Sequence, residues 1–410
     1  MFRMSMQDIG RTLTYLERSK SAPIDIRIDM NSPRGFKVLK YLAPHVARMR
    51  SLTLLGNHTE IRAASLLLCT PSPILQHLRI CANNGLVHLP DDFLGRQTPS
   101  LRSLSFEGIH PAFESHSPLL NLIEFMLSLP KGTSPLRVGA LFQFLSGCPS
   151  LQKICVNSQE TSQDITLDQI ISLESLVELE YACNPVGRIL PCLRLPRLER
   201  LQVSFQFRSG QEQRLADLLP HGGHVLLAGA TKMLYGSYES SQEVKFLGKG
   251  TDVSFNMLPP AIGHAPFDRF LDEMCIPFGQ IEGLTVQGST DVDFPVNVAI
   301  LRNLKVLRIS PSYADSKFTE RFLDLLYPRP ETGVPCQSLQ EIQYTHLGIS
   351  GSLPPLIGLV TERKQVGHQL GLVRLLLPAK CKINWRLVKK LKERVGKVKL
   401  QSRDVLPSLD

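Results

Sequence analysis

A short phrase of spaced apolar residues recurs along the chain. In "PSLRSLSFEGI", Leu101, Leu104 and Phe106 follow the pattern L-x-x-L-x-Φ, in which Φ is a large apolar residue. Most adjacent phrases are separated by about 22 to 26 residues, within the 20–29 residues typical of leucine-rich repeats. The step from 101 to 151 is about two periods long, so one phrase is predicted to be lost or reshaped there. The phrases start at residues 49, 75, 101, 151, 176, 198, 281, 304, 339, 372 and 395.

The segments between these phrases carry a helical pattern. In residues 31–49, Ser32 suits a helix N-cap and Pro33 the first helical position, and apolar residues then recur at helical spacing. One unit of strand, turn and helix cannot bury its own apolar face, but a stack of units can. The sequence therefore predicts an α/β leucine-rich-repeat solenoid, a curved horseshoe of irregular, degenerate repeats with parallel strands on the concave face and helices on the convex face. Further helices are predicted over residues 117–130, 265–277, 316–328 and 384–396.

The phrases divide the chain into four segments. Residues 1–30 are predicted to form an N-terminal cap and residues 31–205 the first half of the repeats. Residues 206–275 depart from the pattern: "HVLLAGA" and "EVKFLGKG" indicate strands with a loop, "YGSYESSQ", between them. This segment is either a set of irregular repeats or an insertion. Residues 276–410 are predicted to form the second half of the repeats, with a basic C-terminal cap.

The positions between the apolar anchors are the candidate binding surface. On a strand they share the face opposite to the anchors, and neighbouring strands place them about 4.8 Å apart, so one partner would contact many of them. Their charges are mixed and most are polar, which favours a protein partner over nucleic acid. The candidate protein-binding residues are His77, Arg79, Ser103, Ser105, Glu107, Lys153, Asn157, Glu178, Glu180, Arg200 and Gln202.

Composition limits where the protein acts. The hydrophobic content of 43% and charged content of 20% are ordinary for a globular protein. No apolar run approaches the roughly 20 residues that cross a bilayer, and the first residues lack the apolar segment of a secretory signal. The nine cysteines include no C-x-x-C pair, so we expect reduced thiols rather than a zinc or redox site. These features predict a cytoplasmic or nuclear protein without a transmembrane segment.

No motif in the sequence indicates catalysis. His221 and His224 in "HGGH" lack the G-x-S-x-G element that an esterase needs and further ligands that a metal needs. "FLGKGTD" does not have P-loop spacing and is predicted to be a hairpin turn. Glu178 and Glu180 share a strand face, but they occupy variable positions of a repeat. We therefore predict a protein that is not an enzyme and holds no cofactor or metal.

The C-terminal region carries the positive charge. From Lys380 to Arg403 there are ten basic residues and one acidic residue, which accounts for the whole formal net charge of +9. The segment from residue 384 predicts an amphipathic helix, which either caps the solenoid or binds nucleic acid, an anionic membrane or an acidic protein. The single tryptophan, Trp385, provides no stacking platform for bases. The candidate basic patch is Lys389, Lys390, Lys392, Arg394, Lys397 and Lys399.

The opening of the chain resembles one family. "YLERSKSAPIDI" is similar to a W/Y-L-x-R-S-x-x-x-P-L-x-L phrase of fungal, mushroom-type F-box-like proteins, and "TPSLRSLSFEGI", "CPSLQKICV" and "LPRLERLQV" are similar to their P-x-L-x-x-L repeats. In that family an upstream F-box binds the adaptor subunit of a cullin ubiquitin ligase, and the repeats hold the target protein. The resemblance implies a ubiquitin-ligase substrate receptor. No L-P-x-E-[LI] segment precedes the phrase here, so ligase coupling is expected only if an F-box lies upstream of this chain. The matching positions are Tyr15, Leu16, Arg18, Ser19, Pro23, Ile24 and Ile26.

Overall fold

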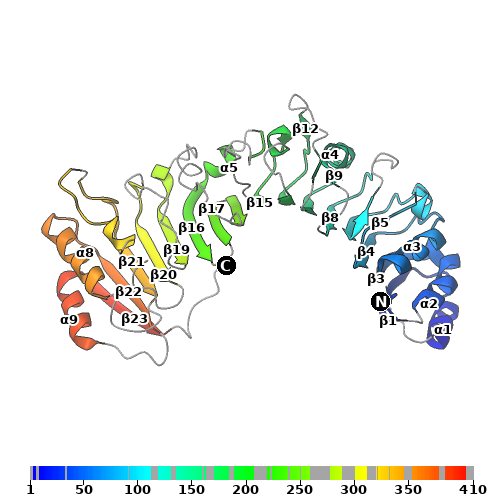
Figure 1. Cartoon of the computed structure of the whole chain (residues 1–410), viewed down its shortest axis with the longest axis horizontal. Helices are drawn as coiled ribbons and strands as arrows, with labels where there is room; N and C mark the ends of the chain where they lie inside the picture. The colour runs from blue at the N-terminus through cyan, green and yellow to red at the C-terminus, as the bar shows by residue number, and fades with distance from the viewer. Residues whose placement is uncertain are drawn as a thin grey trace. The chain divides into compact units, whose positions relative to one another are not determined.

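The protein is a mixed α/β structure with mostly parallel sheets (Figure 1), described by a computed structural model. The chain separates into two compact units, of which unit 1 comprises Met1–Phe205 with Ala216–Gly222 and unit 2 comprises Gln206–Leu215 with Gly223–Asp410. The residues that the structure describes are 3–5, 9–32, 35–90, 92–111, 119–130, 135–158, 161–162, 170–183, 189–206, 219–221, 224–238, 241–249, 251–258, 278–288, 301–311, 320, 322–331, 333–345, 353–377 and 384–402.

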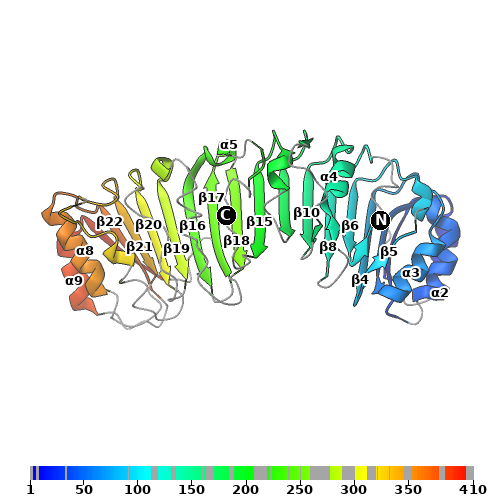
Figure 2. The same cartoon turned by 45° about the horizontal axis from the view of Figure 1, so that its top comes forward.

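Unit 1 is built on one parallel sheet. Its strands pair in sequence order, so each connection returns to start the next strand beside the last one (Figure 2). The predicted parallel strands are confirmed here. The strands are β1 (Arg3–Ser5), β2 (Ile24–Asp29), β3 (Met49–Asn57), β4 (His77–Asn83), β6 (Ser103–Glu107), β8 (Glu124–Leu129), β10 (Lys153–Ser158), β13 (Glu178–Cys183) and β15 (Arg200–Gln206).

The apolar anchors of the repeated phrase form continuous rows on one face of this sheet. Leu104 of β6 is in register with Leu78 of β4 and Phe125 of β8, and all three are buried. Parallel pairing brings the same phrase position of each unit side by side, so each anchor packs on its counterparts in the neighbouring units. A second buried row runs two residues further on, through Ile28, Leu54, Ile80, Phe106, Leu127, Val156, Tyr181 and Val203.

The connections of unit 1 are less helical than the sequence predicts. Some connections hold short two-residue parallel ladders or 3₁₀ turns instead of a helix over every unit. α2 is described from Gly35, whose N–H donates to the Ser32 carbonyl, and Pro33 lies outside the described residues, so the N-cap at Ser32 stays a prediction. The helices are α1 (Ile9–Ser19), α2 (Gly35–Leu42), α3 (His58–Leu67) and α4 (Val138–Ser146), and the short strands are β5 (Val87–His88), β7 (Ile109–His110), β9 (Leu136–Arg137), β11 (Thr161–Ser162), β12 (Ile171–Ser172) and β14 (Leu193–Arg194).

The predicted helix over residues 117–130 is wrong. The structure places β8 there, and this strand supplies the phrase that the step from 101 to 151 lacks: Leu122, Phe125 and Leu127 are buried like other anchors. Apolar residues are so dense in this segment that both helical and strand periods fit them. Pairing with β6 on one side and β10 on the other satisfies the backbone of β8 and decides the outcome.

Unit 2 starts with antiparallel strands and continues with parallel ones. β16 pairs antiparallel with β17, β17 pairs antiparallel with β18, and β16 pairs parallel with β19 on its other side. From β19 the strands again pair parallel in sequence order to β23. The strands are β16 (Ala230–Tyr238), β17 (Ser241–Gly248), β18 (Thr251–Leu258), β19 (Gly283–Gly288), β20 (Val306–Pro311), β21 (Glu341–Thr345), β22 (Leu372–Leu377) and β23 (Lys397–Ser402), and the helices are α5 (His224–Leu227), α8 (Leu353–Gln365) and α9 (Trp385–Arg394).

The described strands of residues 206–275, β16 to β18, form a three-stranded antiparallel meander. The predicted strand over "HVLLAGA" is wrong because its first residues form α5, and the predicted loop over "YGSYESSQ" is wrong because β16 runs to Tyr238 and β17 starts at Ser241. Cross-strand pairs such as Tyr235 with Val244 extend the ladder through these polar residues. The hairpin turn over "FLGKGTD" is confirmed between β17 and β18.

The helices predicted near the C-terminus have different outcomes. α9 is confirmed, and the Asn384 side chain caps it by accepting hydrogen bonds from the N–H groups of Arg386 and Leu387. In the 316–328 segment, residues 320 and 322–324 are helical, and Phe322 is buried. The helix predicted over 265–277 lies outside the described residues.

Candidate functional site: the polar face of the unit 1 sheet

The face of the unit 1 sheet opposite to the anchors is lined by polar side chains, which we call the polar face. In β6, Leu104 and Phe106 are buried, whereas Ser103 and Ser105 are half-buried and Glu107 is exposed. Because paired residues of parallel strands point to the same side, every strand adds its alternate residues to this surface. The polar face therefore follows directly from the strand alternation.

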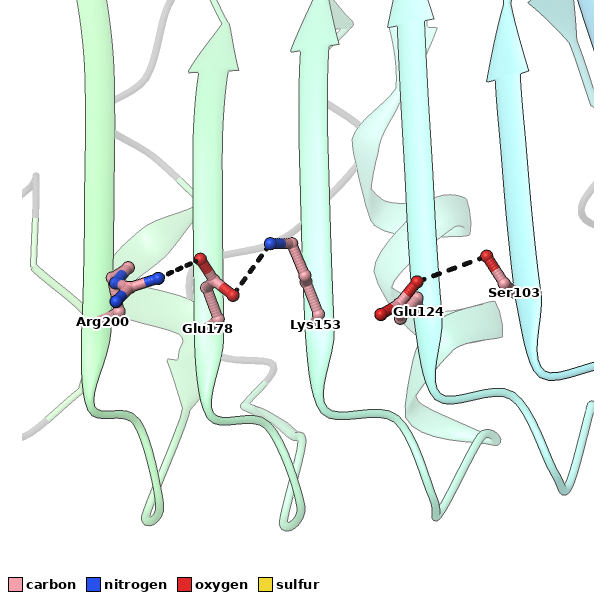
Figure 3. Close-up of polar contacts among 5 residues, drawn as sticks. All are labelled: Ser103, Glu124, Lys153, Glu178 and Arg200. Carbon is pink, nitrogen blue, oxygen red and sulfur yellow. Dashed lines mark hydrogen bonds and ion pairs between the residues drawn. The ribbon is translucent and has the colours of Figure 1, made fainter. Parts of the chain in front are cut away.

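The first row of the polar face carries alternating charges. From β6 to β15 it runs Ser103, Glu124, Lys153, Glu178 and Arg200, which are all in register (Figure 3). Glu178 lies between two cations: Lys153 Nζ is 2.9 Å from its Oε2, and Arg200 Nη1 donates to its Oε1 at 2.8 Å. Ser103 Oγ donates to Glu124 Oε2 at 3.4 Å. The row is a ladder of interactions that fixes the direction of its long side chains.

The charges in this ladder favour the ionised forms of Glu178 and Lys153. Burial raises the pKa of Glu178, but the hydrogen bonds and positive charges of Lys153 and Arg200 outweigh it and hold the pKa below its ordinary value. The hydrogen bond to Glu178 raises the pKa of Lys153. A carboxylate held between two cations is a poor general base, because it gives up its interactions on taking a proton. Glu178 therefore suits recognition better than acid–base chemistry.

Two further charge pairs lie on the N-terminal strands of unit 1. Arg50 donates to both carboxylate oxygens of Asp25, at 2.9 Å from Nε and 2.5 Å from Nη2, and the hydrogen bond from Arg50 lowers the pKa of Asp25. Glu107 Oε2 lies 4.0 Å from Arg79 Nη2 and accepts a hydrogen bond from the Cys81 thiol at 2.6 Å. Burial is the main cause that raises the pKa of Cys81, which favours the protonated thiol over the nucleophilic thiolate.

An apolar side chain stands in the middle of these charges. Met126 of β8 is 43% exposed, although its strand neighbours Phe125 and Leu127 are buried. It lies in register between the half-buried Ser105 and Cys155. Small side chains on both sides leave the thioether accessible, and methionine adapts to the shape of a partner.

The structure brings the sequence-predicted binding residues together on the polar face. His77, Ser103, Lys153, Glu178 and Arg200 belong to the first row. The second row holds Arg79, Ser105, Glu180 and Gln202, and the third holds Glu107 and Asn157.

The sequence reasoning missed other residues of the same face. The residues of β8 were missed because a helix was predicted over residues 117–130, although the spacing of Leu122, Phe125 and Leu127 fits the phrase. Those of β2 precede the first phrase, so the alternation of "IDIRID" was the available signal. Those of β3 lie between the anchors of the first phrase, whose own alternation was the signal. The missed residues are Asp25, Arg27, Ser51, Thr53, Glu124, Met126 and Ser128.

The predicted basic patch is divided between two elements of unit 2. Lys389, Lys390, Lys392 and Arg394 are exposed on α9, whose buried side is formed by Val388 and Leu391. Lys397 and Lys399 instead belong to β23 and point to the sheet face that Arg374 of β22 shares. The helix ends at Arg394 because residues 397–402 pair with β22.

The candidate catalytic and metal residues are not assembled into a site. His221 is exposed and forms an isolated backbone bridge to Arg194, and His224 is the first residue of α5. Within the described parts of the chain, no three His, Cys, Asp or Glu side chains are grouped closely enough to hold a metal ion. The absence of catalysis and of cofactors stays a prediction.

Comparison with known proteins leaves the family open. No model of a protein family and no curated protein matches this chain. The resemblance to F-box-like proteins therefore stays a prediction. None of the helices in the described residues has the length and apolar character needed to cross a bilayer.

Proposed function

We propose that this chain is a non-catalytic protein-binding module of the leucine-rich-repeat type, and that the polar face of unit 1 holds the partner. One observation carries the proposal: polar residues from β2 to β15 lie in register on one face of the sheet while the anchors are buried on the other. The repeated phrase and the strands that pair in sequence order support a solenoid, with this face as its concave side.

The anatomy of the polar face fits a protein partner. Protein interfaces commonly have an apolar centre surrounded by polar and charged residues, and a few central side chains supply most of the binding free energy. Met126 is the apolar centre here, with Glu107 and Arg79 on one side and Lys153 and Glu178 on the other. The charged side chains of the polar face are already oriented by their ion pairs. They therefore lose little further conformational entropy when a partner binds.

The proposal extends to the role that the family resemblance implies. As a substrate receptor of a cullin ubiquitin ligase, this chain would hold a target protein in the cytoplasm or nucleus, with an F-box upstream making the connection to the ligase. A free binding module with the same polar face is the simpler form of the proposal. Recovery of cullin subunits with the tagged natural protein separates the two forms.

Affinity purification of the tagged full chain tests the proposal. The test variant carries Ser105→Arg and Met126→Arg, which place two long charged side chains at the centre of the polar face. The matched control carries Thr59→Arg and Leu66→Arg on α3, which add the same charge at exposed positions away from this face. We expect specific partners to be retained by the unmodified chain and by the control, and to be lost from the test variant.

Two results would contradict the proposal. The first is a set of partners that the test variant retains unchanged, since this would place the binding surface elsewhere. The second is reproducible substrate turnover that disappears when His221 or His224 is replaced, since this would make the chain an enzyme. Circular dichroism of each variant confirms that the fold is intact.

A further inference from the structure

The sheet of unit 2 also presents a face opposite to its buried anchors, and its last four strands make this face cationic. Arg308 of β20 is in register with Gln343 of β21, Arg374 of β22 and Lys399 of β23, and Lys397 lies two residues before Lys399. We call the four cations Arg308, Arg374, Lys397 and Lys399 the cationic face. Adjacent strands are about 4.8 Å apart, so the positive charges lie within one short span of sheet.

One carboxylate faces these cations from the same strands, and it is already engaged. Glu341 of β21 accepts hydrogen bonds from Arg374 Nε at 2.5 Å and from Gln343 Nε2 at 2.7 Å. Burial raises the pKa of Glu341, but these hydrogen bonds and the charges of Arg374 and Arg308 hold it below its ordinary value. Of the four cations, only Arg374 has an ion pair within the described residues. The cationic face thus retains a positive charge, whereas the cations of the row from β10 to β15 in unit 1 share Glu178.

Apolar side chains lie between the charges. Leu372 and Leu376 of β22 flank Arg374 on the same face and are half-buried rather than buried. Leu372 is in register with Lys397, so an apolar group and a cation lie side by side on neighbouring strands. A ligand that matches this surface needs both negative charge and apolar groups.

We propose that the cationic face binds an acidic segment of a partner protein, in which carboxylates alternate with apolar residues. Charge complementarity carries the assignment. A single-stranded nucleic acid is less well matched, because no described residue that β20–β23 contribute to this face is aromatic, and bases bind by stacking on aromatic side chains. This surface belongs to unit 2, whereas the polar face belongs to unit 1.

Fluorescence anisotropy tests the proposal with the full chain and a short labelled peptide in which glutamate alternates with leucine and serine. The test variant carries Arg308→Glu and Lys399→Glu. The matched control carries Lys37→Glu and Arg62→Glu, which change the net charge equally but lie at exposed positions on α2 and α3 of unit 1. Each exposed ion pair contributes roughly 1.5- to fivefold in affinity, so reversing two charges predicts a loss of about tenfold or more. The control is expected to stay within about twofold.

The outcomes divide clearly. Weaker binding at higher salt, together with loss only in the test variant, supports the proposal. Equal loss in both double variants overturns it, because the effect would then come from net charge alone. Absence of peptide binding overturns it as well. Tighter binding of a single-stranded oligonucleotide or of anionic vesicles than of the peptide would reassign the surface to those ligands. If the test variant does not fold, Arg308→Gln with Lys399→Gln replaces it.

Discussion

Phe125 and Met126 are neighbours in β8, and the strand predicts opposite results for replacing them with alanine. Phe125 is 1% exposed and lies in register between the buried Leu104 and Ile154. Met126 is 43% exposed on the polar face. Truncating a buried phenylalanine costs about 3–5 kcal/mol because the lost burial and the cavity both contribute. Truncating Met126 costs less than about 1 kcal/mol, since a side chain that is already 43% exposed loses little burial and leaves no closed cavity.

Urea unfolding followed by circular dichroism measures the two free energies, and hydrogen exchange locates the effect. Phe125→Ala is expected to speed amide exchange in β6, β8 and β10, whereas Met126→Ala leaves exchange unchanged and weakens partner binding. Equal destabilisation of the two variants, or greater destabilisation by Met126→Ala, would contradict the assignment of Phe125 and Met126 to opposite faces of β8. Such a result would mean that residues 124–129 do not alternate between the two faces of a sheet.

Three further outcomes follow from single contacts. Glu178→Gln is expected to lower the free energy of unfolding by about 1 kcal/mol or less at neutral pH, because its two ion pairs are partly solvated. Since the folded-state pKa of Glu178 is lowered, urea midpoints should show this difference above the ordinary carboxylate pKa and lose it as pH falls through the lowered value. Arg363→Met should cost about 3 kcal/mol in urea unfolding, because the fully buried guanidinium donates to the carbonyls of Pro335 and Cys336; a neutral result would show that these carbonyls find other donors. Gly108→Ala should lower the thermal midpoint by several degrees, because φ is +66° there and the added Cβ would meet the Ala82 carbonyl; an unchanged midpoint would contradict that backbone geometry.

The repeated phrase predicted most of the parallel strands of unit 1 and the residues that those strands add to the polar face. A phrase such as Leu101-x-x-Leu104-x-Phe106 places its anchors on one face of a strand and leaves Ser103 and Ser105 on the other. This inference needs only the alternation of a strand and a repeat that recurs, so it holds without knowledge of any contact. The start of α9 was also predictable from local sequence, since Asn384 is an N-cap residue.

The errors lie where local sequence fits two structures. In residues 117–130 the apolar residues are dense enough for a helix or a strand, and pairing with β6 and β10 selected the strand. In residues 230–248 the partner strand, rather than the polar sequence, extended the hairpin through Tyr238. Backbone hydrogen bonds to a distant segment contribute to such choices, and no local pattern reports them.

Within the phrases that it contains, the sequence alone assigned the anchors and the alternate polar residues, because the period of two within each phrase places them on opposite faces. Only the tertiary structure showed which free residues meet. It placed Glu178 between Lys153 and Arg200, exposed Met126 at the centre of the polar face, and set Lys399 on a strand beside Arg374. The physical reason is register: the pairing of neighbouring strands decides which charges lie opposite each other, and it is fixed by backbone hydrogen bonds between segments far apart in the chain.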